Sequence, residues 1–265
     1  MCGRYASSRS PDDLAEEFEV VDPRLDQALP ADYNVAPTKE VYAVLDRAPR
    51  PADEESGTAN ADPVRQLRVL RWGLVPFWAK DPSIGSRMIN ARMETVAEKP
   101  AFRRAFASRR CLLPADGYFE WYETQQRTGT GKAAKFAKQP FFIKPKDGSV
   151  LAMAGLYEIW KDPTRDPDDP DDQDDPGRFL WTCTVLTAEA TDEVGRIHDR
   201  MPLLVTRDRR TAWLNPETPK DQLPDLLVPA QQSGLEAFPV STAVGNVRNN
   251  GPELVEPIPF EESLL

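Results

Sequence analysis

The chain has 265 residues, 40% of them hydrophobic, so it can bury a sizeable core and is not wholly disordered. No apolar run reaches the ~18 residues of a membrane span, and the start MCGRYASSRS has no secretory signal region. The net charge of −10 argues against a nucleic-acid partner, but the charge is unevenly distributed. Residues 162–176 hold eight Asp and one Arg, whereas residues 64–110 hold eleven Lys or Arg and three Asp or Glu. The second stretch can therefore attract a polyanion.

In chain order, the first predicted element is a helix from Pro11, with Ser10 as its cap, Asp13 closing a capping box, and Leu14 and Phe18 on one face. Strands are then predicted at 41–45, 67–74, 111–113, 118–122, 141–144, 151–159, 180–186 and 203–205. Further helices are predicted at 101–107, 187–197, 207–214 and 219–226. Polar or acidic stretches at about 48–63, 124–138 and 162–176 are predicted surface insertions. Many strands with interleaved helices and no regular βαβ rhythm indicate an α+β fold with a mainly antiparallel sheet or barrel core.

The three cysteines, Cys2, Cys111 and Cys183, lack the paired spacing of a disulfide framework or a zinc site. Cys111 and Cys183 lie in apolar strands and are predicted to be inert core residues. Cys2 directly follows the initiator Met, and a small second residue generally permits removal of that Met. Cys2 would then carry a free α-amine, with a pKa near 7.7–8.0, beside its thiol, with a pKa near 8.5.

Such a terminus has a specific reactivity toward aldehydes. The neutral amine condenses with an aldehyde to a Schiff base, and the adjacent thiol can close a five-membered thiazolidine ring on the imine carbon. From the position of Cys2 alone, an incidental cysteine at a frayed terminus remains the alternative.

Six motifs occur in the order MCGRYA at 1–6, YNVAPT at 33–38, WGLVPFWAKD at 72–81, INARMET at 89–95, PADGYFEWYE at 114–123 and HDRMP at 198–202. Together they resemble the SRAP family, named for an SOS-response-associated peptidase and regarded as abasic-site processing proteins. The resemblance implies one SRAP-like domain over residues 1–245 and a C-terminal tail over 246–265. It also implies that Cys2 attaches covalently to abasic sites in single-stranded DNA, including single-strand/double-strand junctions, and protects the damaged DNA during repair.

The resemblance implies a catalytic site made of Cys2, Asn90, Glu120 and His198. An abasic sugar is mostly a closed ring, and a carboxylic acid that burial keeps protonated can protonate the ring oxygen. Glu120 suits that role, and His198 is the only histidine able to move protons near neutral pH. The alternatives are a Glu120 on a solvated strand face and a His198 that only satisfies carbonyls at a helix end.

The candidate DNA-binding residues are Arg4, Asn34, Pro37, Trp72 and Arg92. Arg4 and Arg92 are predicted to contact phosphates, because arginine binds phosphate bidentately. The resemblance implies that the other three line the DNA channel, with Pro37 near the bases. Trp72 or Trp78 can stack on an exposed base, and core packing, the alternative, is expected more for Trp78 than for Trp72.

Three other functions remain open. N-terminal-nucleophile amidohydrolases, such as glutamine amidotransferase domains, also begin Met-Cys-Gly. A peptidase can use Cys2, His198 and Glu120 as nucleophile, base and orienting group. A non-covalent reader of modified bases, such as 5-hydroxymethylcytosine, would form no adduct. The preferred prediction is a monomeric cytoplasmic protein that associates with the nucleoid when bound to DNA, with no cofactor, no metal and no membrane partner, and with AP-lyase or peptidase-like activity as further hypotheses.

Overall fold

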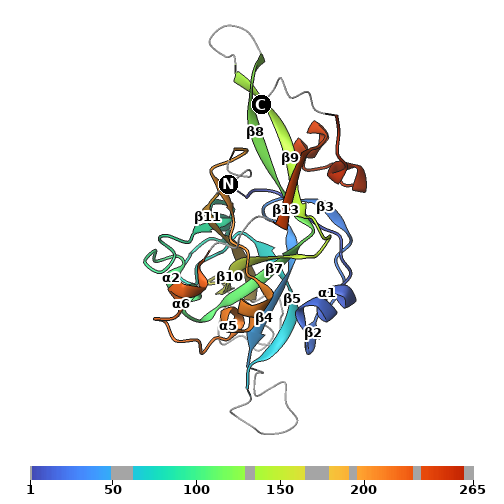
Figure 1. The fold of residues 1–265 in the computed structure, drawn as a ribbon. Coiled ribbons are helices and arrows are strands. Elements are labelled where there is room, and N and C mark those ends of the chain that lie inside the picture. Colours follow the sequence, from blue (N-terminus) through green and yellow to red (C-terminus); the bar gives the residue numbers. More distant parts are fainter. Residues whose placement is uncertain are drawn as a thin grey trace.

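The computed structural model describes residues 2–48, 62–128, 135–164, 179–190, 196–228 and 234–259. Its strands form one sheet of five strands and one of eight, with short helices around them (Figure 1). No helix within these ranges is long and apolar enough to cross a membrane.

The five-stranded sheet has the order β13 (Leu235–Pro239), β9 (Lys135–Pro145), β8 (Gly117–Thr128), β1 (Tyr5–Ser7) and β3 (Asp32–Val35). The eight-stranded sheet has the order β12 (Arg200–Pro202), β11 (Phe179–Glu189), β10 (Leu151–Lys161), β7 (Arg110–Ala115), β4 (Glu40–Arg47), β5 (Val64–Trp72) and β2 (Asp22–Arg24), with β6 (Asn90–Arg92) beside β11. The helices are α1 (Pro11–Phe18), α2 (Arg103–Ser108), α5 (Arg210–Leu214) and α6 (Leu223–Leu226), and the main 3-10 turns are η2 (Pro82–Arg87), η5 (Arg207–Arg209), η7 (Thr242–Gly245) and η8 (Pro252–Val255).

The larger sheet closes into a small barrel through β11. That strand pairs antiparallel with β10 and also parallel with β5, through Thr182 beside Arg71 and Cys183 beside Trp72. Strands β5, β4, β7, β10 and β11 therefore form a closed ring. Closure leaves one set of alternating side chains inside the barrel and the other set outside it.

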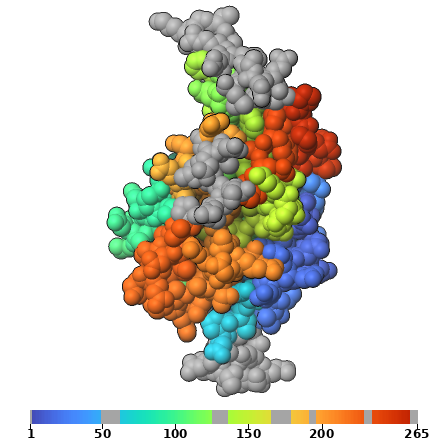
Figure 2. Space-filling model, viewed as in Figure 1, coloured from blue at the N-terminus to red at the C-terminus, as the bar shows by residue number. Residues whose placement is uncertain are grey.

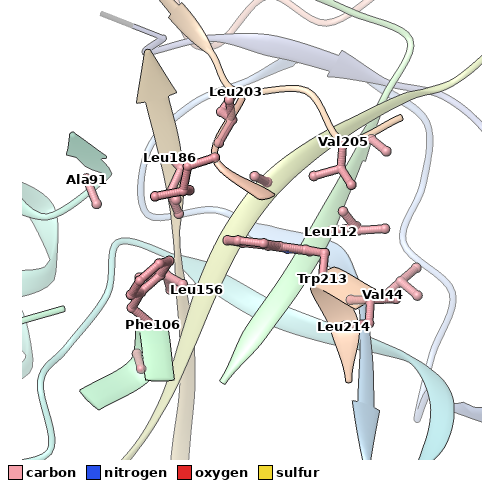
Figure 3. Close-up of a cluster of buried hydrophobic side chains, with 14 of the residues drawn as sticks. Val44, Ala91, Phe106, Leu112, Leu156, Leu186, Leu203, Val205, Trp213 and Leu214 are labelled. Carbon is pink, nitrogen blue, oxygen red and sulfur yellow. The ribbon is translucent and has the colours of Figure 1, made fainter. Parts of the chain in front are cut away.

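Alternation along β7 shows this division. Cys111 and Leu113 belong to the cluster inside the barrel, whereas Leu112 between them belongs to a second cluster outside it. The outer cluster is centred on Trp213 of α5, whose indole points into the middle of the surrounding aliphatic side chains (Figure 3). The Trp213 indole N–H donates to the Cys111 carbonyl over 2.9 Å, so its one polar atom is satisfied.

The five-stranded sheet covers one end of the barrel. Tyr5 of β1 and Tyr118 of β8 are fully buried in the same cluster as the barrel interior. The C-terminal residues complete this half, because η7 contacts β9 and η8 contacts β3. Figure 2 shows these red residues against the yellow-green part of β9 and above the blue N-terminal part.

The expected α+β fold with a mainly antiparallel, barrel-containing core is confirmed. The first helix begins at Pro11 as predicted, and Ser10 and Asp13 form the predicted capping box. Most predicted strands overlap observed ones, namely β4, β5, β7, β8, β9, β10 and β11. The helices at 101–107 and 207–214 are observed as α2 and as η5 followed by α5, whereas α6 is shorter than the predicted 219–226.

Three predictions are wrong within the described ranges. Residues 187–189 are not helical but end β11, because they pair with β12 on one side, and Thr187 also pairs with β6 on the other. Residues 191–195 of that predicted helix lie outside the described ranges. The strand placed at 203–205 is observed at 200–202, with only an isolated bridge from Leu204 to Met153. Residues 124–128 and 135–138, predicted within an insertion, instead extend the hairpin of β8 and β9.

Replacing Trp213 by alanine is expected to reduce the free energy of unfolding by about 3–5 kcal/mol, because a fully buried indole and its hydrogen bond are lost. The matched control is Trp78→Ala, at a side chain that is 49% exposed, with an expected change within about 1 kcal/mol. Urea denaturation of both variants measures this difference. Equal losses would show that the outer cluster does not depend on Trp213.

Candidate functional site

Cys2 lies in the interior of the protein rather than at a frayed end. Its side chain is fully buried in the cluster that contains Tyr5, Trp72 and Tyr118, at the end of the barrel covered by the second sheet. Burial raises the pKa of the Cys2 thiol, and the nearby Glu120 carboxyl raises it further. The thiol is therefore protonated at neutral pH.

Asn90 holds the backbone of Cys2. Strand β6 runs parallel to β11, with Asn90 beside Val185, and the Asn90 amide Nδ2 donates to the Cys2 carbonyl over 2.8 Å. The other end of the amide, Oδ1, is buried and accepts no hydrogen bond from any residue in the described ranges. This oxygen is consequently available to accept a hydrogen bond from a donor that enters the site.

Glu120 of β8 is 2% exposed, so the solvated strand face considered from the sequence is wrong. Burial raises the pKa of its carboxyl to about 7, and the positive charge of the amino terminus partly offsets this rise. Both the protonated and the ionised carboxyl are then populated near neutral pH. The same group can donate a proton in one step and accept one in another.

His198 lies just before β12 and is partly exposed. Its Nδ1 accepts the backbone N–H of Arg200 over 3.0 Å and also lies 2.9 Å from an Asp199 carboxylate oxygen. Burial lowers the pKa of His198, which favours the neutral ring. With Nδ1 accepting from Arg200, the neutral ring carries its proton on Nε2, whereas a protonated ring would point Nδ1–H at Asp199.

Asn34 and Arg4 are bound within the protein. Asn34 is fully buried, and its amide donates to the carbonyls of Asn246 and Asn249 over 3.0 and 2.9 Å. Arg4 donates to the Asn34 side-chain oxygen over 2.7 Å and to the Val244 carbonyl over 2.8 Å. These contacts fasten the residues around η7, including part of the predicted tail, to β1 and β3.

The two tryptophans of the WGLVPFWAKD motif are placed in the opposite order to that expected. Trp72 is fully buried, packs 5.2 Å from the Tyr5 ring and donates to the Ile89 carbonyl over 2.9 Å. It offers no face to a base in this structure. Trp78 is 49% exposed, and so is Phe77, which the sequence interpretation passed over. The reason is that Trp72 ends a barrel strand and points inward, whereas the other two follow a turn.

Pro37 is partly exposed and begins a tight turn in which the Lys39 N–H bonds the Ala36 carbonyl. Thr38 has a φ of 74°, a conformation that costs a β-branched residue of order 1 kcal/mol. Its N–H donates to the Trp72 carbonyl over 2.8 Å, which holds the turn against the end of β5. Strain of this kind has no sequence signal beyond the proline.

The described ranges hold no group of three or more His, Cys, Asp and Glu side chains able to bind a metal ion. Cys2, Asn90 and Glu120 form one connected group, through the bond between Asn90 and Cys2 and the electrostatic coupling of Cys2 with Glu120. Arg92 is exposed at the end of β6, two residues from Asn90.

Comparison with known families places these residues in context. The family described as SOS response associated peptidase (SRAP) matches residues 1–247. The chain belongs to the SRAP family. An SRAP relative, the abasic site processing protein YoqW of Bacillus subtilis, is 38% identical over 97% of this chain and 99% of its own. The Escherichia coli relative, abasic site processing protein YedK, is 33% identical over 97% of this chain and 100% of its own.

A more distant relative and a solved structure match the same region. The abasic site processing protein HMCES of Xenopus tropicalis is 27% identical over 97% of this chain and 78% of its own. A crystal structure of a protein from Bacteroides thetaiotaomicron matches 97% of this chain and 100% of its own, with a TM-score of 0.73 and 24% identity. That match confirms the fold of the whole SRAP domain.

Glu120→Gln is expected to make stability less dependent on pH. Because the folded pKa is raised from 4.5 to about 7, the folded protein binds more protons than the unfolded chain between these values. Wild-type stability therefore falls as pH rises from 4.5 to 7, by up to about 3 kcal/mol from this group. Denaturation at pH 5 and pH 8 measures it, and identical pH dependence in both proteins would contradict the buried carboxyl.

Proposed function

We propose that this protein captures abasic sites in single-stranded DNA as a covalent adduct on Cys2, and so shields them during repair. The observation that carries the proposal is the pairing of a held N-terminal cysteine with a buried carboxyl that titrates near neutral pH. Membership of a family whose curated relatives are abasic site processing proteins supports the substrate class.

The adduct forms in two balanced steps after removal of Met1. The neutral α-amine of Cys2 attacks the aldehyde carbon of the opened sugar, and loss of one water gives the imine. The Cys2 sulfur then adds to the imine carbon while the thiol proton passes to the nitrogen, which closes the thiazolidine. The raised pKa of the thiol favours this order, because the thiol stays protonated while the amine reacts first.

Glu120 and His198 divide the proton transfers. The protonated Glu120 carboxyl can protonate the ring oxygen of the closed sugar and, later, the hydroxyl that leaves as water. His198 is neutral near pH 7 and can take a proton in the complementary steps. The buried Oδ1 of Asn90 is suited to accept from the Cys2 amine and orient its lone pair.

The DNA strand is proposed to follow exposed aromatic and basic side chains. Phe77 and Trp78 are each 49% exposed and can stack on the bases beside the damaged position. Arg92 is exposed next to Asn90 and can contact a phosphate. Single-stranded DNA presents the sugar without the cost of unpairing, which favours it and strand junctions over intact duplex.

The burial of Cys2 disfavours the hydrolase alternatives. Cysteine hydrolases and peptidases need a thiolate nucleophile, whereas burial raises the pKa of this thiol. An amine nucleophile has no such requirement.

Single-stranded DNA carrying one abasic site should give a denaturation-resistant adduct with the wild-type protein. Cys2→Ala retains an amine able to form a reversible imine but cannot form the ring, so its adduct should be lost on denaturation. Cys111→Ala, a buried cysteine of the barrel interior, is the matched control and should react normally. Denaturing gels and intact mass measure this and also reveal strand cleavage. An equally stable adduct in Cys2→Ala would refute the thiazolidine.

The rate of adduct formation is expected to pass through a maximum between about pH 7 and 8. Protonated Glu120 is lost as pH rises through about 7, whereas the neutral amine increases through about 7.7–8.0. Glu120→Gln should be slower and should no longer lose rate above pH 8. Single-turnover rates from pH 5.5 to 9 measure both profiles, and superimposable profiles would remove Glu120 from the mechanism.

A further inference from the structure

A cleft of about 940 Å³ lies on the barrel away from Cys2. Its walls are residues 23–30, the two ends of β4, part of β5 and the start of β11. Four arginines line it, Arg24, Arg47, Arg68 and Arg71, and we name it the arginine cleft. Two acidic residues, Asp26 and Glu40, also line it.

The strand register places the part of the arginine cleft formed by Arg47, Arg68 and Trp181 at the opposite mouth of the barrel, and the cleft continues from there toward Arg71. Val185 of β11 pairs with Asn90, which holds Cys2, and Trp181 lies four residues earlier on the same inward face. Four strand residues correspond to about 13 Å. Ala43 and Leu45 of β4 face into the barrel, so Arg47, two residues after Leu45, lies on the same face of the strand. Arg68 of β5 pairs with Ala43 and therefore lies on the inward face as well.

Trp181 holds two of these arginines close together. The guanidinium carbons of Arg47 and Arg68 lie 4.8 and 4.5 Å from its ring centroid, and the Tyr157 ring stacks on it at 5.8 Å and 10°. Arg68 also donates to the Gln66 side-chain oxygen over 2.8 Å, which fixes its orientation. Gln66 in turn donates to Asp22, so the support extends to β2.

Two arginines of the cleft form no ion pair with another described residue. Arg24 forms an ion pair with Asp22, whereas Arg68 and Arg71 form none with any carboxylate in the described ranges. Burial lowers the pKa of Arg68, and the neighbouring charges of Arg47 and Arg24 lower it further. Two like charges held on one indole repel each other, and an anion between them would remove that cost.

We propose that the arginine cleft is a phosphate-binding site, separate from the Cys2 site. Forked guanidiniums match the oxygens of a phosphate, and the Trp181 ring is already covered by Tyr157 and the arginines. The site therefore recognises the phosphate and not a base. The phosphate belongs either to the flanking DNA strand, an assignment that rests on the proposed function, or to a free phosphorylated small molecule.

The test uses Cys2→Ala protein, so that no covalent reaction contributes and failure of the adduct chemistry does not affect the result. Calorimetry at fixed ionic strength measures the Kd of pyrophosphate, and anisotropy measures the Kd of single-stranded DNA without an abasic site. Adding Arg47→Gln and Arg68→Gln should raise the pyrophosphate Kd at least about tenfold. The control variant, Arg9→Gln with Arg207→Gln, loses the same charge at ion pairs outside the cleft. Its pyrophosphate Kd should change less than about twofold.

The DNA measurement distinguishes the two sources. If the Arg47 and Arg68 substitutions also weaken DNA binding, the site binds the strand backbone. In that case the slope of the logarithm of the DNA binding constant against the logarithm of salt concentration should become smaller in magnitude by about 1.4. Unchanged DNA affinity assigns the site to a free phosphorylated ligand.

Arg71→Gln provides a single substitution in case the double variant does not fold, and should weaken pyrophosphate binding at least about threefold. No pyrophosphate binding to the parent protein, or equal losses in the cleft and control variants, would overturn the proposal.

Discussion

Burial of the first residues of the chain between the barrel and the five-stranded sheet is the constraint on which the site depends. Chain termini are usually frayed, and a reactive amine at a frayed end would have no fixed geometry. Here Tyr5 is fully buried and pairs with Val35 on β3 and Tyr118 on β8, so β1 is an internal strand of its sheet. Asn90 also fixes the Cys2 backbone, because its side-chain amide donates to the Cys2 carbonyl.

One physical cause, loss of contact with water, sets three pKa values in useful directions. Burial raises the pKa of the Cys2 thiol and of the Glu120 carboxyl, and it lowers the pKa of His198. All three groups are thereby pushed toward their neutral forms. A neutral acid and a neutral base are the states that the proposed condensation of the Cys2 amine with an aldehyde would use, and a protonated thiol would not compete with the amine before ring closure.

The barrel has two chemically different mouths. Cys2, Tyr5 and Tyr118 occupy one, under the second sheet, and the Trp181 stack of arginines occupies the other. Strand β11 connects the two, because its inward side chains run from Trp181 through Cys183 to Val185. The residues between them are apolar and fully buried, so the two mouths are separated by packed core.

The sequence by itself determined the local elements and the family. The capping box of Ser10 and Asp13 and the alternation of most strands are local signals, since neighbouring residues carry them. The six motifs identified the family and, through it, the residues proposed to react. Sequence motifs can be recognised without knowing which side chains contact one another in the folded protein.

Only the tertiary structure decided burial and long-range partners. Residues 187–189 became a strand because they pair with β12, and Thr187 pairs also with Arg92 of β6, which is distant in sequence. Trp72 turned inward and Trp78 outward because barrel closure brings Cys183 beside Trp72. The amide of Asn34 donates to carbonyls more than 200 residues away in sequence. Such contacts arise from chain closure over long separations, which no local pattern encodes.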